Sequence, residues 1–214
     1  MSAPRIAIVD YDLGNVKSMI NALSKVGAQP ILTNSRKEIL SADALVLPGV
    51  GAFSHGMQQL KKYNLIDIIH SFASTNKPFL GVCLGMQIMF DRSNEFGETE
   101  GLGLFSGDIK IMGVDPIKQQ KLPHVGWNSI CLPNNIKNWK NTIFSEIQGN
   151  TDMYFVHSYA ASPLLNAEIL ATTLYYDHEF CSAVMRGNIY GVQFHPEKSA
   201  EPGLLILKSL MDLA

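Results

Sequence analysis

The first ninety residues alternate short apolar runs with segments of helical periodicity, and no other feature restricts the fold of this chain as strongly. Apolar residues recur at helical spacing between the runs. Strands that are apolar on both faces and separated by helices are typical of a parallel sheet covered by helices on both sides. A helix over Leu84–Phe90 is expected directly after the fourth run. The predicted strands are Arg5–Val9, Pro30–Leu32, Ala44–Leu47 and Phe79–Val82.

The second half of the chain carries strand-like segments joined by short turns. Arg186-Gly187-Asn188 lies between two of these segments and predicts a hairpin. A closing amphipathic helix is expected over Pro202–Leu213. We therefore expect residues 1–214 to form one α/β domain, in which a mostly parallel sheet flanked by helices continues into an antiparallel or mixed region. The strand-like segments are Asp108–Met112, Trp127–Leu132, Met153–Tyr159, Ile169–Tyr176, Ala183–Arg186 and Ile189–Phe194.

Charge and cysteine content exclude several classes of function. The 17 Lys and Arg residues are outnumbered by 19 Asp and Glu residues, which gives a net charge of −2, whereas nucleic-acid binding needs clustered positive charge. No apolar run reaches the roughly 18 residues of a membrane span, and the N-terminus shows no signal-peptide pattern. Cys83, Cys131 and Cys181 are too few and too widely spaced for a disulfide framework or a zinc site. We therefore expect a cytoplasmic protein without a nucleic acid, membrane or metal-ion partner.

The sharpest chemical motif is Gly81-Val82-Cys83-Leu84-Gly85. A Cys between a strand and a helix, with glycines two positions before and after it, matches the nucleophile elbow, because the glycines permit a strained turn that exposes the thiol. The N-terminus of the following helix would favour a thiolate. Most free cysteines are small buried hydrophobes, and we interpret Cys131 and Cys181 in that way. The context of Cys83 instead predicts a nucleophile.

A base and its orienting group are predicted by His195-Pro196-Glu197, which follows an apolar run. Residues i and i+2 of extended backbone point to the same side, so Glu197 can reach the His195 ring, and Pro196 favours that geometry. A carboxylate bonded to one ring nitrogen leaves the other to accept the thiol proton. His157 is the competing base, but no carboxylate stands two residues after it. The sequence thus predicts a triad of Cys83, His195 and Glu197.

A glycine-containing loop over Leu47–Phe53 follows the third predicted strand. Ligands of such sheets bind at the carboxyl ends of strands, so this loop and the predicted nucleophile should lie side by side. We expect the backbone N–H groups of Val50, Gly51 and Leu84 to stabilise a developing oxyanion. A dinucleotide-binding loop is the competing interpretation. It is disfavoured because Ser54 replaces the third glycine of that motif and the loop does not follow the first strand.

Together these motifs resemble one family, the class I, triad-type glutamine amidotransferases. The resemblance implies a flavodoxin-like sheet and hydrolysis of glutamine without a cofactor. By position, Cys83 would be the nucleophile, His195 the acid and base, and Glu197 its orienter. The polar end of the substrate glutamine would be held by the side chains of Gln87 and Glu95 and by the backbone at Gly51, Ser158 and Tyr159. The resemblance rests on Pro48–Phe53, Gly81–Gln87, Gly101–Leu104, Leu122–Asn128, Tyr154–Tyr159 and His195–Ser199.

The segment Pro123–Asn128 narrows the resemblance to the glutaminase subunits of imidazole glycerol phosphate synthases. There the ammonia passes to a separate (β/α)₈-barrel cyclase subunit, which makes imidazole glycerol phosphate and AICAR in histidine biosynthesis. The resemblance implies a heterodimer in which Asn15, Trp127 and Lys198 face the barrel. Asp12 stands where the family usually has glycine, in a loop that should also face the partner.

Three other interpretations stay open. Asn94–Gly97 and Gly187–Gly191 also resemble homologues that feed a barrel synthase in surface-polysaccharide sugar biosynthesis. A stand-alone cysteine hydrolase is disfavoured by Gln87, Glu95 and the His-Pro-Glu segment. A regulatory subunit with a decayed site predicts the loss of a triad member, and all three are present. The acceptor site would lie on the other chain, so this sequence does not decide the pathway.

Overall fold

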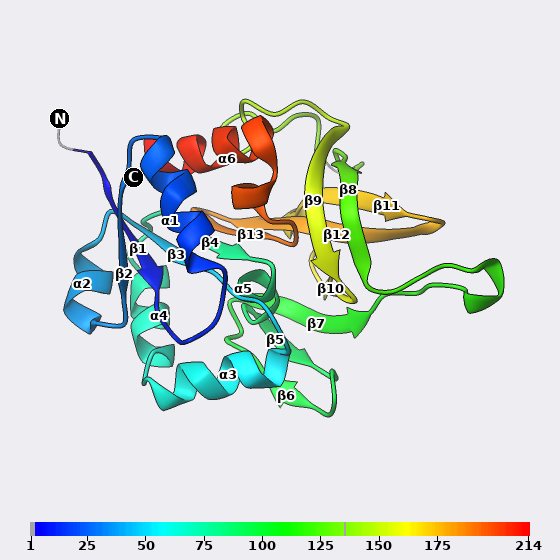
Figure 1. The fold of residues 1–214 in the computed structure, drawn as a ribbon, viewed down its shortest axis with the longest axis horizontal. Helices are drawn as coiled ribbons and strands as arrows, with labels where there is room; N and C mark the ends of the chain where they lie inside the picture. The colour runs from blue at the N-terminus through cyan, green and yellow to red at the C-terminus, as the bar shows by residue number, and fades with distance from the viewer. Residues whose placement is uncertain (1–2, 135) are drawn as a thin grey trace.

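A mixed sheet of eleven strands lies at the centre of the computed structural model, which describes residues 3–134 and 136–214 (Figure 1). The strands of the chain are β1 (Arg5–Val9), β2 (Gln29–Thr33), β3 (Ala44–Leu47), β4 (Phe79–Val82), β5 (Phe90–Ser93), β6 (Thr99–Glu100), β7 (Phe105–Ile111), β8 (His124–Ile130), β9 (Thr151–His157), β10 (Tyr159–Pro163), β11 (Ile169–Tyr175), β12 (His178–Arg186) and β13 (Ile189–Val192). The order is β2-β1-β3-β4-β13-β12-β10-β7-β5-β6, with β11 on β12 and with β8 and β9 as a separate pair. Because β2, β1, β3, β4 and β13 are parallel and the pairs from β13 to β7 are antiparallel, the predicted fold class is confirmed.

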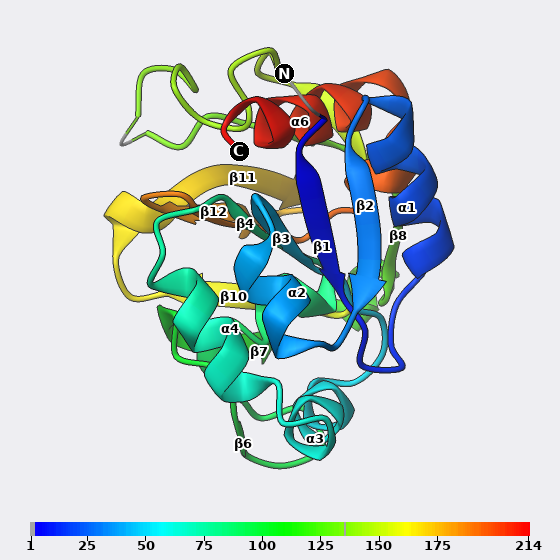
Figure 2. The same cartoon turned by 90° about the vertical axis from the view of Figure 1, so that its left-hand side faces the viewer.

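Helices cover both faces of the parallel strands (Figure 2). They are α1 (Val16–Lys25), α2 (Arg36–Ser41), α3 (Phe53–Lys62), α4 (Ile66–Ala73), α5 (Leu84–Gln87) and α6 (Ala200–Asp212), with 3₁₀ turns η1 (Pro116–Lys118), η2 (Asn166–Glu168) and η3 (Pro196–Lys198). Ile6 and Ile8 pack in the cluster of α1 and α6, whereas Ala7 and Val9 pack in the cluster of α2, α3 and α4. Successive side chains of a strand point to opposite faces, so the four buried residues of β1 after the exposed Arg5 are all apolar.

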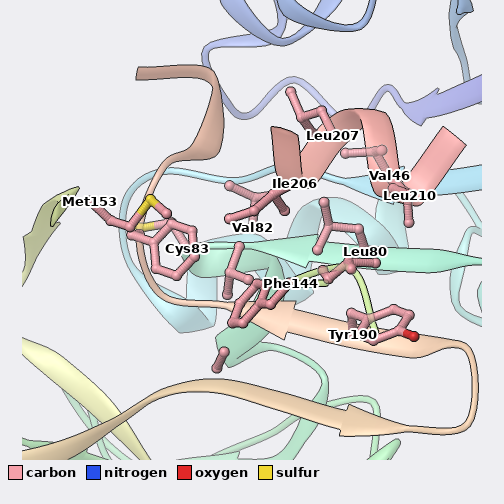
Figure 3. Packing of buried hydrophobic residues seen from close by; sticks show 14 of the residues in the cluster. Val46, Leu80, Val82, Cys83, Phe144, Met153, Tyr190, Ile206, Leu207 and Leu210 are labelled. Atoms are coloured by element: carbon pink, nitrogen blue, oxygen red, sulfur yellow. The ribbon is translucent and has the colours of Figure 1, made fainter. Parts of the chain in front are cut away.

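The core reaches the predicted nucleophile. Figure 3 shows the β4 side chains Leu80 and Val82 near residues of α6, with Cys83 at the end of β4, and the β13 side chain Tyr190 belongs to the same cluster. Each of these three neighbours is at most 1% exposed. The end of β4 is therefore held by well-packed apolar surface on the α6 side.

The strand register brings the carboxyl ends of three strands, β3, β4 and β13, together at one edge of the sheet. Leu47 of β3 is level with Gly81 of β4, and Val82 is level with Val192 of β13. The residues that follow these three strands are thus neighbours, because parallel strands end at the same edge. The Pro48 loop, Cys83 and the His195 segment begin there, as predicted.

Several predicted boundaries shift, and two of the differences change the architecture near Cys83 and Tyr159. The helix after Cys83 is the single turn α5, and the chain enters β5 at Phe90. The predicted strand Met153–Tyr159 divides at Ser158 into β9 and β10, which belong to different sheets. The hairpin is confirmed, with Arg186 paired to Ile189.

None of the helices in the described residues combines the length and apolar character that crossing a membrane would require. The expectation about a leader segment concerns the start of the chain, where residues 1 and 2 lie outside the described residues.

Candidate active site

Cys83 occupies a strained backbone position between β4 and α5. Its φ of 54° and ψ of −111° lie in a region that residues with a side chain rarely adopt. The neighbouring turn tolerates only glycine, since a Cβ at Gly85 would collide with the carbonyl oxygen of Leu47. The Cys83 N–H donates to the Val192 carbonyl at 2.8 Å, which fixes the turn to β13. These are the features of a nucleophile elbow.

His195 and Glu197 form a buried hydrogen-bonded pair. Nδ1 of His195 donates to Oε1 of Glu197 at 2.8 Å, and the two side chains are 2% and 3% exposed. Nε2 of His195 is buried and has no hydrogen-bond partner at normal distance among the described residues. The free nitrogen is therefore the one that can exchange a proton with a thiol.

Burial and charge act in opposite directions on the pKa of His195. Burial lowers it, whereas the hydrogen bond to Glu197 and the charge interactions with Cys83 and Glu197 raise it by more, so that it lies at about 10. The balance favours an imidazolium beside the Cys83 sulfur and the Glu197 carboxylate.

The Ser199 side chain links the His195 turn to β9 through hydrogen bonds to the main chain. It is fully buried, and its hydroxyl donates to the His195 carbonyl at 2.7 Å while it accepts the Tyr154 N–H at 3.0 Å. The His195 N–H donates in turn to the Tyr154 carbonyl at 2.9 Å. These bonds attach the base to β9 and restrict its position.

His157 is close to the site, but its ring is fully engaged. Nδ1 donates to the Tyr159 carbonyl at 2.9 Å, and Nε2 is 3.3 Å from Nδ1 of His124. Burial lowers the pKa of His157 to about 3 and the pKa of His124 to about 4, so both rings are neutral at pH 7. The geometry therefore favours His195 over His157 as the base.

A cavity of about 430 Å³ opens in front of Cys83. Such a volume suits a small molecule. All five predicted substrate-binding residues and all three predicted oxyanion residues contribute to its wall. The lining consists of Val50, Gly51, Cys83, Leu84, Gln87, Glu95, Phe96, Pro123, Val156, His157, Ser158 and Tyr159. Sequence reasoning missed Phe96, Pro123 and Val156.

Gln87 and Glu95 are each partly committed to the protein. Nε2 of Gln87 donates to the Tyr159 carbonyl at 2.9 Å and to Oε1 of Gln193 at 3.0 Å. Oε2 of Glu95 accepts the N–H of Phe53, the first residue of α3, at 2.7 Å. Both donor hydrogens of Gln87 are thus used, and its amide oxygen is the group left to accept a hydrogen bond from a ligand.

The loop after β3 is anchored at one end. Tyr11 is completely buried, and its hydroxyl donates to the Pro48 carbonyl. A Cβ at Gly49 would lie 3.0 Å from Leu84 Cβ, whereas a Cβ at Gly51 would meet nothing within 4 Å. The Pro48–Gly49 end therefore packs tightly against the elbow, and the Gly51 end has free space.

Residues 7–210 match the protein family described as glutamine amidotransferase class-I. The chain belongs to the class-I glutamine amidotransferase family. As an amidotransferase of this class, it combines a cysteine elbow, a histidine–glutamate pair and a cavity of suitable size. In the described residues, no group of three or more His, Cys, Asp or Glu side chains could hold a metal ion.

Curated relatives of this amidotransferase are similar over their full length. It is 45% identical over 212 residues to "Imidazole glycerol phosphate synthase subunit HisH 1" of Legionella pneumophila (strain Lens), covering 97% of this chain and 99% of that protein. It is 40% identical over 213 residues to "Imidazole glycerol phosphate synthase subunit HisH" of Thermosynechococcus vestitus, covering 100% and 99%.

Solved structures share its fold. PurLQS from Thermotoga maritima superposes with a TM-score of 0.74 at 18% identity, covering 98% of each chain. A glutamine amidotransferase from Thermotoga maritima gives a TM-score of 0.62 at 16% identity, covering 99% of this chain and 97% of that chain.

The three predicted interface residues of the amidotransferase are all accessible. Asn15 is exposed at the start of α1. Trp127 on β8 is 54% exposed and therefore does not belong to the core. The rings of Trp127 and Tyr154 are edge-to-face, with their centroids 6.1 Å apart. Nζ of the exposed Lys198 lies 5.7 Å from the centroid of the Tyr154 ring. Trp127, Tyr154 and Lys198 thus form a continuous group on β8, β9 and η3.

Asp12, in the loop before α1, has a φ of 62°. Glycine adopts this left-handed conformation without strain, and Asp is tolerated there better than most residues. The Asp12 carboxylate accepts a hydrogen bond from Tyr63 and lies 3.4 Å from Nζ of Lys62. These contacts link the loop before α1 to the end of α3.

Proposed function

We propose that this chain is the glutaminase subunit of an imidazole glycerol phosphate synthase, and that it hydrolyses glutamine to glutamate and ammonia. The proposal is carried by the Cys83 elbow, which opens on the cavity. Glu197 accepts a hydrogen bond from the buried His195 ring and helps to raise its pKa. Sequence identity of 40% to 46% over the full length to curated subunits of that synthase favours this function over those of other class-I amidotransferases.

The reaction has two stages. The Cys83 sulfur attacks the side-chain amide carbon of glutamine, and the resulting oxyanion is stabilised by N–H groups of Val50, Gly51 and Leu84. His195 donates its proton to the amide nitrogen, the C–N bond breaks, and ammonia leaves a thioester. A water molecule then gives a proton to His195 and attacks the thioester carbon, so that the C–S bond breaks and glutamate is released.

Substrate orientation follows from the hydrogen-bonding groups of the cavity. Oε1 of Gln87 is the acceptor left for the α-ammonium group of glutamine, because Nε2 is already used twice. Oε1 of Glu95 adds a negatively charged acceptor, while its Oε2 caps α3. The backbone at Gly51, Ser158 and Tyr159 completes the pocket for the polar end of the substrate. These positions direct the side-chain amide towards Cys83.

Ammonia must be transferred without entering bulk water, where it would be protonated and lose its nucleophilicity. The proposal therefore includes a separate (β/α)₈-barrel cyclase, bound in the cytoplasm as the second subunit of a heterodimer. The group of exposed Trp127, half-buried Tyr154 and exposed Lys198, together with Asn15, is the surface assigned to that partner. Aromatic and basic side chains are enriched in interface hot spots.

The test is glutamate release from glutamine by the purified chain, alone and with the histidine-pathway cyclase of the same organism and its ribonucleotide substrate. We expect slow release by the chain alone and stimulation of about 10-fold or more by the mixture. Absence of release under both conditions would contradict the glutaminase assignment. Release without stimulation, by a protein whose Cys83 remains free to react with an alkylating reagent, would assign the chain to a sugar-modifying barrel synthase.

Trp127→Ala is expected to weaken binding of the cyclase by about 10-fold or more, because a large exposed aromatic side chain is removed from the proposed interface. Glutamate release by the isolated chain should remain unchanged. Titration calorimetry with the cyclase measures the affinity. Leu164→Ala is the control. Leu164 is 74% exposed, but it follows the carboxyl end of β10 and is not part of the proposed interface. Equal affinities of the wild type and Trp127→Ala would remove Trp127 from the interface.

A further inference from the structure

Gln193 is a fully buried polar residue between β13 and His195, and the reaction scheme above gives it no role. Its N–H donates to the Ser182 carbonyl at 2.9 Å. This backbone bond involves only the main chain, so the Gln193 side chain is left to make other contacts. Nε2 of Gln193 lies 3.7 Å from Sγ of Cys83, within hydrogen-bonding distance for sulfur.

The orientation of the Gln193 amide is determined by its neighbours. A backbone carbonyl can only accept, so the atom of Gln87 that faces the Tyr159 carbonyl at 2.9 Å must be Nε2. That same Nε2 is 3.0 Å from the Gln193 side chain, which must therefore present its oxygen to Gln87. The remaining end of Gln193 is the NH₂ group, and it faces the sulfur.

We propose that Gln193 is a catalytic residue that donates a hydrogen bond to the Cys83 sulfur and that Gln87 holds it in the donating orientation. An N–H donor interacts only weakly with a neutral thiol but forms a charge-assisted bond with a thiolate. Gln193 thus favours the nucleophilic form of Cys83 and fixes its direction. The inference rests on the proposed function where it concerns catalysis, but its effect on the sulfur can be measured without glutamine.

The hydrogen-bonded series Gln87–Gln193–Cys83 also connects the substrate pocket to the nucleophile. The proposed ligand group of Gln87 is its Oε1, while its Nε2 orients Gln193, and Gln193 contacts Cys83. A substrate ammonium that binds Oε1 therefore holds the same amide that keeps the donor directed at the sulfur. The series extends the other way to His157, which shares the Tyr159 carbonyl with Gln87.

The first experiment measures the rate at which iodoacetamide alkylates Cys83 at pH 7, followed by mass spectrometry of the Cys83 peptide. Gln193→Met preserves the side-chain length and removes the donor, and we expect it to slow alkylation about 3- to 10-fold. The kcat for glutamine hydrolysis should fall by a similar factor, with KM within about twofold of the wild type. Ser182→Ala is the matched control, because it alters a fully buried polar neighbour without touching the sulfur.

A second variant tests the role of Gln87 in orienting Gln193. Gln87→Met should slow alkylation in the wild-type background, although the Gln87 side chain is hydrogen-bonded to Gln193 and not to the sulfur. The same change should have no further effect in Gln193→Met, because there is no amide left to orient. Additive effects of the two changes would overturn the orienting role.

Unchanged alkylation in a folded Gln193→Met protein, judged by a melting temperature within a few degrees of the wild type, would overturn the proposal. If Gln193→Met slows alkylation but the wild type releases no glutamate from glutamine, the contact with the sulfur stands and the proposed function fails. If the wild type hydrolyses glutamine and alkylation is unaffected, the proposed function stands and the role of Gln193 fails.

Discussion

Replacing Cys83 by alanine is expected to abolish glutamine-dependent synthesis by the complex and to leave synthesis from added ammonium salts unchanged. In the proposed scheme the Cys83 thiol is the protein group that bonds to the substrate carbon, so its loss removes the first step. In the proposed complex the acceptor reaction takes place on the cyclase subunit, and alanine keeps the Cβ and the backbone of the elbow. Both activities are measured on the assembled complex, with glutamine or with ammonium chloride as nitrogen source.

Cys131→Ala serves as the matched control for Cys83→Ala, because Cys131 is a free, half-buried thiol on an isolated bridge away from the cavity. It should retain both activities. Cys181 is a poor rival nucleophile, since burial raises its pKa to about 12. Loss of both activities in Cys83→Ala would mean that Cys83 supports the structure or the assembly. Retention of both would identify a different nucleophile.

The position of the site could be predicted from the sequence because strand ends in a parallel sheet are predictable. The apolar runs before Pro48 and Cys83, and the run before His195, each identify a strand that ends at the same edge. Pairing of Leu47 with Gly81 and of Val82 with Val192 then follows from compact packing of neighbouring strands. Local motifs supplied the residue types, and topology placed them together.

The short helix after Cys83 could not be predicted, because long-range hydrogen bonds override its apolar periodicity. The carbonyls of Ile88 and Met89 would bond within a continuing helix, but they accept N–H groups from Leu102 and Leu104 at 2.8 and 2.7 Å. The segment Gly101–Leu104 thus ends the helix and starts β5. Nothing in the sequence around Cys83 indicates that contact.

Gln193 was missed for a related reason. Its neighbours Val192 and Phe194 read as part of an apolar strand, and a single polar residue there resembles one that faces solvent. Its burial and its contact with Cys83 depend on the register between β13 and β4, which places it beside the elbow. A buried glutamine whose side chain has to find partners is recognisable only once that register is known.

Replacing Glu197 by glutamine should lower kcat for glutamine hydrolysis by about 10²- to 10⁴-fold. Glutamine has nearly the same shape, but it removes the charge that stabilises the imidazolium and allows the His195 ring to change its tautomer. Glu201→Gln is the control, because Glu201 is exposed in the first turn of α6, four residues away. Steady-state kinetics of the wild type and both variants measures the effect.

The same substitution predicts a change in how stability depends on pH. The pKa of His195 in the folded protein, about 10, is above its ordinary value of 6.5. Protonation of His195 therefore stabilises the fold fully below about pH 6.5, and this contribution disappears as the pH rises towards 10. Glu197→Gln removes one of the two groups that raise the pKa. The difference in melting temperature between wild type and variant should thus be largest near pH 6 and shrink steadily towards pH 10. A difference that is constant over this range would show that Glu197 stabilises the protein independently of the charge on His195, and the kinetic loss would then have to come from misplacement of the ring alone.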